Sequence, residues 1–373
     1  MLKSKQKSKQ TNRTVIRKLT HNPDEWPLDM FCTICPDFDI CGGISSEIGG
    51  YCYRHCCGGK DECQTVCRKN PSTFKSKVRE IGGFAFEYIP SVEPVAHPVL
   101  NGTAPLISNG SGRHARVRSE IVAVKLRKVV NMKKGILKYS NREELADRLK
   151  IDTTSELVVT GIEQDKWVEP WWNIGRDRRR SLLNEFMKLG VALVTPPNFS
   201  LFCDQPRPDN FSAMKRIALV QYEFLVAGIP CALHPHIITE VDSKRWISFI
   251  ATRPEIQTIA YEFTTGAGLT LVRQRHINHL INLAESTPWV LDLVVRGDER
   301  VIAELAPYYR NILYIDTNAF MKTIYRKKAI RAGNQKLDWQ SVTTPNEISL
   351  DALLQHNVDE VSLGARQIFN HAA

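Results

Sequence analysis

The residues most able to do chemistry are cysteines concentrated in one short segment near the N-terminus. Residues 31–67 hold eight of the ten cysteines, spaced C-x2-C-x5-C and then, after ten residues, C-x3-C-C-x5-C-x3-C. Thiolates so close in sequence can bind one metal centre, and the glycines between them let the backbone turn tightly around it. The segment has few large apolar residues, so we expect bound metal to stabilise it. The predicted ligands suit two four-thiolate centres: Cys32, Cys35, Cys41, Cys52, Cys56, Cys57, Cys63 and Cys67.

The spacing favours iron–sulfur clusters over zinc. Paired zinc knuckles usually show two C-x2-C pairs, and this segment has one, whereas iron–sulfur clusters tolerate irregular spacing. The stretch CTICPDFDICGG resembles the C-x2-C-x5-C-G-G run in the auxiliary-cluster domains of some radical-SAM enzymes. The C-x3-C-x2-C motif of that superfamily is absent from the sequence, so the resemblance implies a cluster without radical chemistry. Two zinc ions are the alternative. Cys203 and Cys231 are expected in the core.

A second group of candidates follows the apolar runs of the later chain. A carboxylate within such a run costs several kcal/mol unless it is paired, and two on successive runs indicate a site. The pair His234 and His236 has the i, i+2 spacing that permits joint metal ligation on a strand. We expect a carboxylate and imidazole site, similar in kind to those of barrel nucleases and isomerases, in which a metal activates water and Arg296 and Lys322 bind phosphate. The candidate catalytic residues are Glu163, His234, His236, Glu262, Asp292, Arg296 and Asp316.

These candidates require a fold that brings strand ends together. Short apolar runs alternate with helical patterns, as expected for parallel strands buried on both faces. Eight βα units predict a closed (β/α)8 barrel of the TIM type, with its site at the C-terminal ends of the strands; an open doubly wound sheet is the alternative. Residues 101–114 are expected to form a loop. The expected strands are 84–89, 121–126, 156–162, 191–196, 231–237, 258–263, 289–295 and 311–316. The expected helices are 142–150, 176–190, 209–228, 242–251, 269–285, 299–307 and 318–331.

The domain boundaries follow from these elements. We expect a basic tail over residues 1–24, the cysteine module over 25–75, the barrel over 80–333 and a partly helical extension over 334–373. The core stretch VTPPNFSLFCDQPRPDNFSAMKRIALVQYEFLVAGIPCALHP resembles an uncharacterised family of bacterial, archaeal and phage proteins. The family pattern has Asp where this chain has Asn198. The resemblance implies the fold and a bacterial or mobile-element origin, and it implies no activity.

Charge and hydropathy restrict the class of protein. The net charge is +10, and residues 1–18 hold seven basic side chains and no acid. Such a tail either gains affinity for nucleic-acid phosphates by counterion release or serves only to keep the protein soluble. The sequence lacks a long apolar run and a secretory signal, so we expect a cytoplasmic protein without membrane contact. The leading hypothesis is a barrel enzyme acting on nucleic acid or nucleotides. The alternatives are a non-catalytic nucleic-acid-binding protein and an iron–sulfur redox enzyme.

Overall fold

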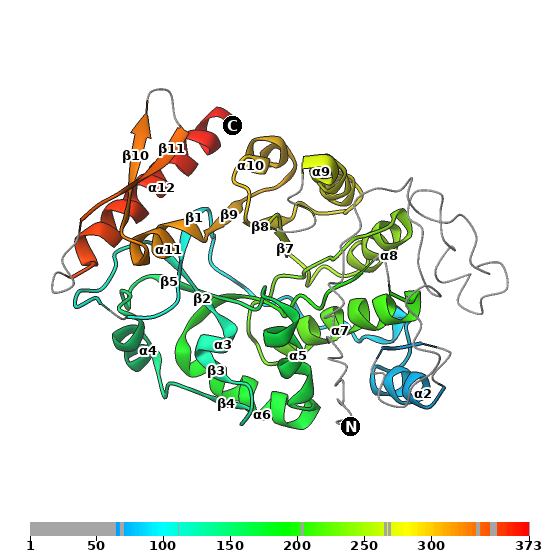
Figure 1. The fold of residues 1–373 in the computed structure, drawn as a ribbon. Coiled ribbons are helices and arrows are strands. Elements are labelled where there is room, and N and C mark those ends of the chain that lie inside the picture. The colour runs from blue at the N-terminus through cyan, green and yellow to red at the C-terminus, as the bar shows by residue number, and fades with distance from the viewer. Residues whose placement is uncertain are drawn as a thin grey trace, which may run out of the picture.

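The computed structural model is a parallel β-barrel surrounded by helices (Figure 1). It describes residues 65–67, 71–110, 112–202, 205–264, 267, 270–332, 336–343 and 349–372. Seven parallel strands form one sheet in the order β6-β5-β2-β1-β9-β8-β7. Their bounds are β1 Gly102–Ile107, β2 Ile121–Lys125, β5 Glu156–Thr160, β6 Val191–Thr195, β7 Thr258–Glu262, β8 Asp292–Arg296 and β9 Ile312–Asp316.

A short segment between β6 and β7 closes the sheet into a barrel. Cys231 bridges to Val194 in β6, and Leu233 bridges to Ile259 in β7, both in parallel. The amide of Ala232 donates to the carbonyl of Val194 at 2.8 Å, and the amide of Leu233 donates to the carbonyl of Thr258 at 2.9 Å. The segment therefore acts as the fifth of eight strands, and the (β/α)8 prediction is confirmed.

Helices follow most strands and cover the outside of the barrel. Small and branched side chains from all eight strands fill its interior, among them Ala104, Ala123, Val158, Leu193, Ala232, Ala260, Val294 and Leu313. A much larger apolar layer lies between the strands and the helices. The helices are α3 Leu126–Val129, α4 Arg142–Leu149, α5 Asp165–Asn173, α6 Arg176–Phe186, α7 Arg207–Val226, α8 Glu240–Ile250, α9 Thr270–Glu285, α10 Val301–Leu305 and α11 Asn318–Ile324. A small antiparallel pair, β3 Val130–Asn131 and β4 Ile136–Leu137, follows α3.

The chain before β1 runs down the outside of the barrel, beginning with α2, Pro71–Glu80. Phe84 and Phe86 pack against α7 and α8, where Phe86 stacks on Trp246 at 4.9 Å between ring centroids. Farther along, Arg253 donates to the carbonyl of Pro90 at 3.0 Å. His97 then reaches Thr258, the first residue of β7, at 3.2 Å. The segment thus crosses from the C-terminal to the N-terminal ends of the strands before entering β1.

The C-terminal residues complete the helical layer. A hairpin of β10 Lys327–Ala332 and β11 Lys336–Ser341 is followed by α12 Asp351–Ala372. The connection from β1 to β2 has no helix in its described part, 108–110 and 112–120. The N-terminus of α12 binds this connection instead, since the amides of His114 and Ala115 donate to Asp351 at 3.0 and 2.9 Å. α12 therefore belongs to the barrel wall. Among the described residues, no helix has both the length and the apolar character that a bilayer crossing requires.

Three predicted elements are wrong. Residues 84–89 form a 3₁₀ turn, Phe86–Tyr88, because their apolar alternation serves packing on α7 and α8. The first strand is instead Gly102–Ile107, within the expected loop. The helix expected over 318–331 ends at Ile324, and the chain then turns at Arg326, with φ +53°, into β10.

Candidate active site

Polar side chains from neighbouring strands meet at the C-terminal end of the barrel. Lys125, Glu262 and Arg296 end their strands, and each lies two residues beyond an interior alanine or valine. Because side chains alternate along a strand, they share the inner face with those apolar residues, one layer nearer the mouth. Arg127, Glu163 and Asn198 follow strands and contact this layer. We call the set the mouth cluster: Lys125, Arg127, Glu163, Asn198, Glu262 and Arg296.

Glu163 holds two cations of the mouth cluster. Its carboxylate accepts from Nε of Arg127 at 2.7 Å and lies 3.3 Å from Nζ of Lys125. The Glu163 side chain is only 6% exposed, so these charges interact where water screens them weakly. Burial lowers the pKa of Lys125, and the carboxylate of Glu163 opposes this shift. An amine with a lowered pKa gives up its proton more readily than an ordinary lysine.

Asn198 links the two carboxylates of the mouth cluster. Its Oδ1 accepts from the backbone amide of Glu163 at 2.9 Å, while its Nδ2 donates to Oε2 of Glu262 at 3.4 Å. An aspartate could make the first bond, but it would face Glu262 with a like charge. An amide at this position therefore fits the neighbouring carboxylate.

Glu262 and Arg296 are direct neighbours in the register of β7 and β8. Nη1 of Arg296 lies 3.7 Å from Oε1 of Glu262, and it donates to the carbonyl of Ile162. The hydroxyl of Thr264 donates to the same carboxylate. Nε of Arg296 is buried and has no hydrogen-bond partner in the described structure. This ion pair is loose, and it leaves donor capacity on the guanidinium.

Two glycines allow these strand ends to crowd together. A Cβ at Gly161 would lie 2.6 Å from the backbone nitrogen of Pro197, and one at Gly297 would lie 2.6 Å from the carbonyl carbon of Phe263. Gly297 also has φ +110°, a conformation that side chains rarely adopt. Larger residues would separate the segments that carry Glu163, Asn198, Glu262 and Arg296.

The two candidate histidines lie beside the mouth cluster in a dry environment. The His234 ring stacks on Tyr261, with centroids 6.0 Å apart and planes 3° apart, and its two nitrogens have no hydrogen-bond partner among the described residues. Burial, and then the neighbouring His236, lower the pKa of His234 to about 3. His236 accepts at Nδ1 from the amide of Leu201 at 3.3 Å, and burial lowers its pKa too. Both imidazoles are therefore neutral at pH 7.

The expected position of Asp292 is wrong. Asp292 is the first residue of β8, so it lies at the opposite end of the barrel from Arg296, about 13 Å along the strand. Its carboxylate accepts from Arg310 at 3.0 and 2.8 Å and from Asn311 at 2.9 Å, and His97 lies 3.8 Å away. The reason for a carboxylate in this apolar run is therefore a paired structural role.

Asp316 ends β9 but does not join the mouth cluster. It follows the interior residue Ile315 and so lies on the outer face of the strand. Its oxygens accept from the amides of Asn318 and Ala319 at 2.8 and 2.9 Å, which caps α11. Burial raises the pKa of Asp316 to about 6, against the effect of the two amide donors. Lys322, expected to bind phosphate, lies over Trp339 at 5.6 Å instead.

The structure does not gather the expected carboxylates and histidines into a metal site. Within the described ranges, no group of three or more His, Cys, Asp or Glu residues is placed to hold a metal ion. The basic tail and the predicted ligands from Cys32 to Cys63 lie outside those ranges, whereas Cys67 is described and partly buried. Beside it, the amide of Val66 donates to Asp209 in the first turn of α7 at 2.8 Å. This turn follows the C-terminal end of β6.

Sequence reasoning missed Lys125 and Arg127. A lysine that ends an apolar run was the available signal, but a lysine leaving a strand is common, and its ion pair with Glu163 depends on the fold. The segment KWVEPWW holds three tryptophans that differ in burial. Trp171 and Trp172 are core residues, whereas Trp167 is 41% exposed.

Comparison with known proteins gives only distant structural similarity. No family model matches the chain, and no curated protein matches it in sequence. Two similar solved structures are the tryptophan synthase alpha chain from Legionella pneumophila subsp. pneumophila, with TM-score 0.38, and tryptophan synthase subunit alpha from L. pneumophila str. Paris, with TM-score 0.36. Each is 11% identical and covers 73% of this chain, and the match spans 92% and 93% of those chains. The likeness is too distant to bear on activity.

Proposed function

We propose that this protein is an enzyme whose active site is the mouth cluster and whose substrate carries a phosphate group, as nucleotides and nucleic acids do. The observation that carries the proposal is the charge balance at the mouth. Lys125, Arg127 and Arg296 supply three cations, and Glu163 and Glu262 supply two carboxylates. The cluster therefore holds one excess positive charge in a partly buried site, where an anionic ligand would complete the pairing.

The residues suit distinct roles. Arg296 contacts Glu262 only loosely, so its guanidinium can exchange that contact for a phosphate oxygen, and we assign it this role. Among the described residues, Glu262 contacts Asn198, Thr264 and Arg296, and we assign it the proton transfer. Glu163 positions Lys125 and Arg127. The lowered pKa of Lys125 allows it to donate or accept a proton near the same group.

The cysteine module adds a second part to the proposal. We propose that its thiolates bind iron–sulfur clusters, with two zinc ions as the alternative, in a cytoplasmic protein of a bacterium or mobile element. Support comes from the cysteine spacing. Anaerobic purification with metal analysis and a visible spectrum tests it. About four or eight irons per chain with absorbance near 400 nm would support iron–sulfur clusters. About two zincs per chain would support the alternative. The absence of both metals would refute metal binding by the cysteine module.

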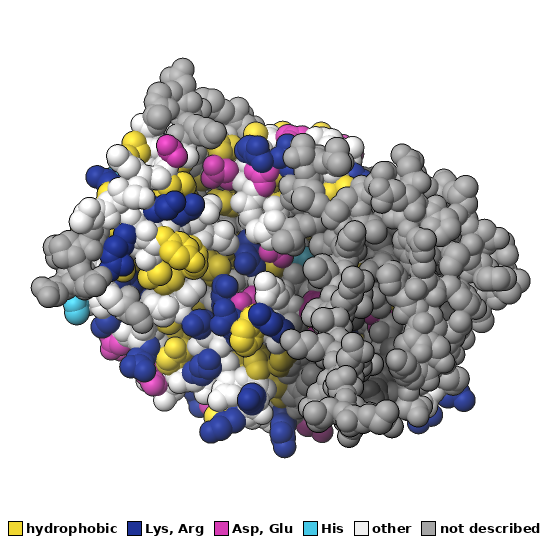
Figure 2. Space-filling view, viewed as in Figure 1, with side chains coloured by type: hydrophobic (Ala, Val, Ile, Leu, Met, Phe, Trp, Pro, Cys, Tyr) yellow, Lys and Arg dark blue, Asp and Glu magenta, His cyan; other side chains and the backbone are white. Residues whose placement is uncertain are grey.

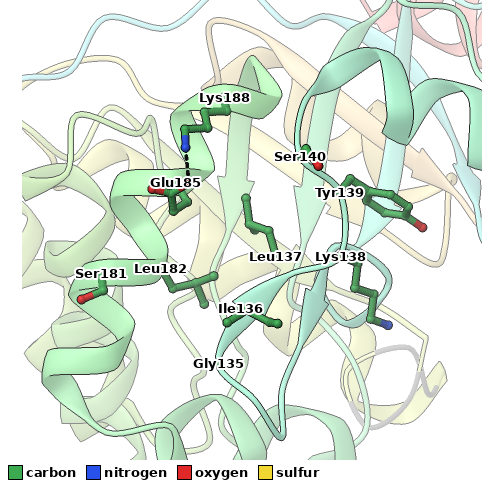
Figure 3. Close-up of a pocket in the computed structure, with 10 residues that line it drawn as sticks. All are labelled: Gly135, Ile136, Leu137, Lys138, Tyr139, Ser140, Ser181, Leu182, Glu185 and Lys188. Atoms are coloured by element: carbon green, nitrogen blue, oxygen red, sulfur yellow. Dashed lines mark hydrogen bonds and ion pairs between the residues drawn. The ribbon is translucent and has the colours of Figure 1, made fainter.

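A second candidate function is nucleic-acid binding without catalysis, and a basic outer surface favours it. Lys and Arg side chains gather on the face that holds the β3–β4 pair and α6 (Figure 2). A shallow pocket of about 450 Å³ lies there, between the two elements (Figure 3). Lys138 and Lys188 line it, and Lys188 pairs with Glu185. Arg178 lies beside the turn at Gly135. Exposed cations of this kind track a phosphate backbone.

One experiment separates the two functions. The full chain is incubated with nucleotides and short oligonucleotides, and products are detected by mass spectrometry beside a salt-dependent binding assay. Catalysis predicts product that Glu262→Gln abolishes and Asp292→Asn retains. Binding without catalysis predicts no product. It also predicts a salt dependence of binding that weakens when three basic residues are replaced by Gln: Lys133 and Lys134, which are exposed in the turn between β3 and β4, and Arg178. Turnover that survives Glu262→Gln would contradict the proposed active site.

A further inference from the structure

Trp167 occupies an unusual position for a large aromatic residue. It lies in the first turn of α5, four residues after Glu163, and remains 41% exposed. The other tryptophans of the same helix are buried: Trp171 stacks on Phe224 at 5.5 Å, and Trp172 donates its Nε1 proton to Glu80 at 2.8 Å. Core packing therefore explains Trp171 and Trp172 and leaves Trp167 unexplained.

Arg127 connects the exposed ring to the mouth cluster. Its guanidinium carbon lies 4.6 Å from the centroid of the Trp167 ring, while its Nε donates to Glu163 at 2.7 Å. Nζ of Lys166 lies 5.5 Å from the same centroid. Glu163 in turn lies 3.3 Å from Nζ of Lys125. The exposed Trp167 ring, with two cations beside it, therefore lies next to the mouth cluster and its excess positive charge.

We propose that Trp167 and Arg127 form a stacking subsite for a nucleobase, whose phosphate is bound by Arg296 and Lys125. This inference rests on the proposed function and narrows its substrate to a nucleotide. Indole and guanidinium planes stack on any base, because every base has a π-face, and cations beside the ring strengthen the contact. A sugar phosphate or free phosphate would use the cations and leave the indole unused.

The test is isothermal titration of the full chain with adenosine 5′-monophosphate, ribose 5-phosphate, inorganic phosphate and adenosine. Base stacking on an aromatic side chain contributes about 1–3 kcal/mol, so the nucleotide should bind roughly 5- to 150-fold more tightly than ribose 5-phosphate. Trp167→Ala should abolish this preference, and Trp167→Phe should retain most of it. Trp339→Ala is the matched control, since Trp339 also lies under a lysine but on the β10–β11 hairpin.

The outcomes separate the subsite from the function on which it rests. Equal affinity for the nucleotide and ribose 5-phosphate, or a preference that survives Trp167→Ala, would overturn the stacking subsite while leaving the phosphate site intact. Adenosine binding that requires Trp167 but gains nothing from a phosphate would support the subsite and refute the proposed phosphate site. Binding of none of the four ligands would overturn both.

Discussion

The two ends of the barrel both hold a carboxylate on an inner strand face, but they differ in how that carboxylate is paired. At the N-terminal end, Asp292 has two bonds from Arg310 and one from Asn311, all within 3.0 Å. At the C-terminal end, Glu262 accepts a bond from the hydroxyl of Thr264, but its bond from Asn198 is 3.4 Å long and its contact with Arg296 is 3.7 Å long. At the N-terminal end the carboxylate of Asp292 is fully paired. At the C-terminal end Arg296 keeps an unpaired Nε in the described structure, and the mouth cluster has one more cation than carboxylate.

This difference indicates why similar residues serve different purposes. A buried charge with all its partners fixed is stable but has no capacity for a ligand. A carboxylate whose contacts with its amide and cation partners are long loses less interaction energy when a substrate replaces those contacts. Within one fold, the pairing of a carboxylate therefore distinguishes a structural position from a reactive one better than its burial does.

The largest expected effect comes from removing the proton-transfer group at the mouth. Glu262→Gln should lower turnover of the substrate found in the nucleotide screen by about 100-fold or more, because general acid–base catalysis contributes about 10²–10⁴-fold. Asp292→Asn is the matched change at the other end and should leave turnover within about twofold while lowering the melting temperature. Equal losses of turnover in the two variants would remove the distinction between the ends.

The second effect is acid destabilisation from two histidines beside Tyr261: His234, whose ring stacks on this tyrosine, and His276 of α9, whose Nδ1 lies 2.6 Å from its hydroxyl. Burial lowers the pKa of His234 and of His276 to about 3, so the folded protein binds fewer protons than the unfolded chain below pH 6.5. Between pH 7 and pH 5 each histidine should remove about 2 kcal/mol of the free energy of unfolding. Asp316, with its pKa raised to about 6, acts in the opposite direction. Over the same pH range it adds about 1 kcal/mol to the free energy of unfolding.

Chemical denaturation at pH 7 and pH 5 checks this prediction. The three groups together predict a net fall of about 3 kcal/mol in the free energy of unfolding on acidification, and His276→Gln should reduce this fall by about two-thirds. Asp316→Asn should make the fall steeper, because it removes the group that favours the folded state at low pH. A free energy of unfolding that rises toward pH 5 would show that the histidines are hydrated or charged in the folded protein.

The third effect concerns the arginines at the two ends. Arg296→Ala should weaken phosphate binding about 10- to 100-fold, since hydrogen bonds to charged groups contribute about 1.5–3 kcal/mol. Arg310→Ala removes the corresponding arginine at the N-terminal end and should leave that affinity unchanged. Calorimetric titration with inorganic phosphate measures both. A loss of affinity on changing Arg310 alone would move the anion site to the other end.

The smallest effect is expected at Asn198, which bonds to both Glu163 and Glu262. Asn198→Asp keeps the shape but places a carboxylate beside Glu262, and it should cost about 1–2 kcal/mol of the free energy of unfolding at pH 8. Like-charge repulsion raises a carboxyl pKa, so the folded state gains a proton more readily and the deficit should shrink toward pH 5. A deficit that stays constant with pH would indicate packing damage instead of charge repulsion. Asn184→Asp, an exposed site on α6, serves as the control.

The sequence predicted the barrel because six of its strands are uninterrupted apolar runs, but it could not locate β1. Pro105 and the glycine, serine and asparagine residues around it are typical of a loop, and only pairing with β2 and β9 makes the segment a strand. Residues 84–89 have the alternation of a strand, yet their phenylalanines pack on helices. Local pattern cannot distinguish these cases, since both bury the same side chains.

The candidate site was predicted in part for a similar reason. Glu163, Glu262 and Arg296 were found because each lies at a strand end. Asp292 was misplaced because β8 begins three residues later than its apolar run suggests, which transfers the carboxylate to the other end of the barrel. Asp316 was misplaced because the side of the strand depends on register. Lys125 and Arg127 become notable only when the fold brings Glu163 to them.

The most direct test of the central claim is a crystal structure of the full chain soaked with tungstate, a phosphate analogue with a strong anomalous signal. The account predicts an anomalous peak at the mouth, bonded to Arg296 and Lys125, and loss of that peak in Arg296→Ala. A peak confined to the basic surface of the β3–β4 pair and α6, or to Arg310 at the N-terminal end, would contradict the assignment of the active site.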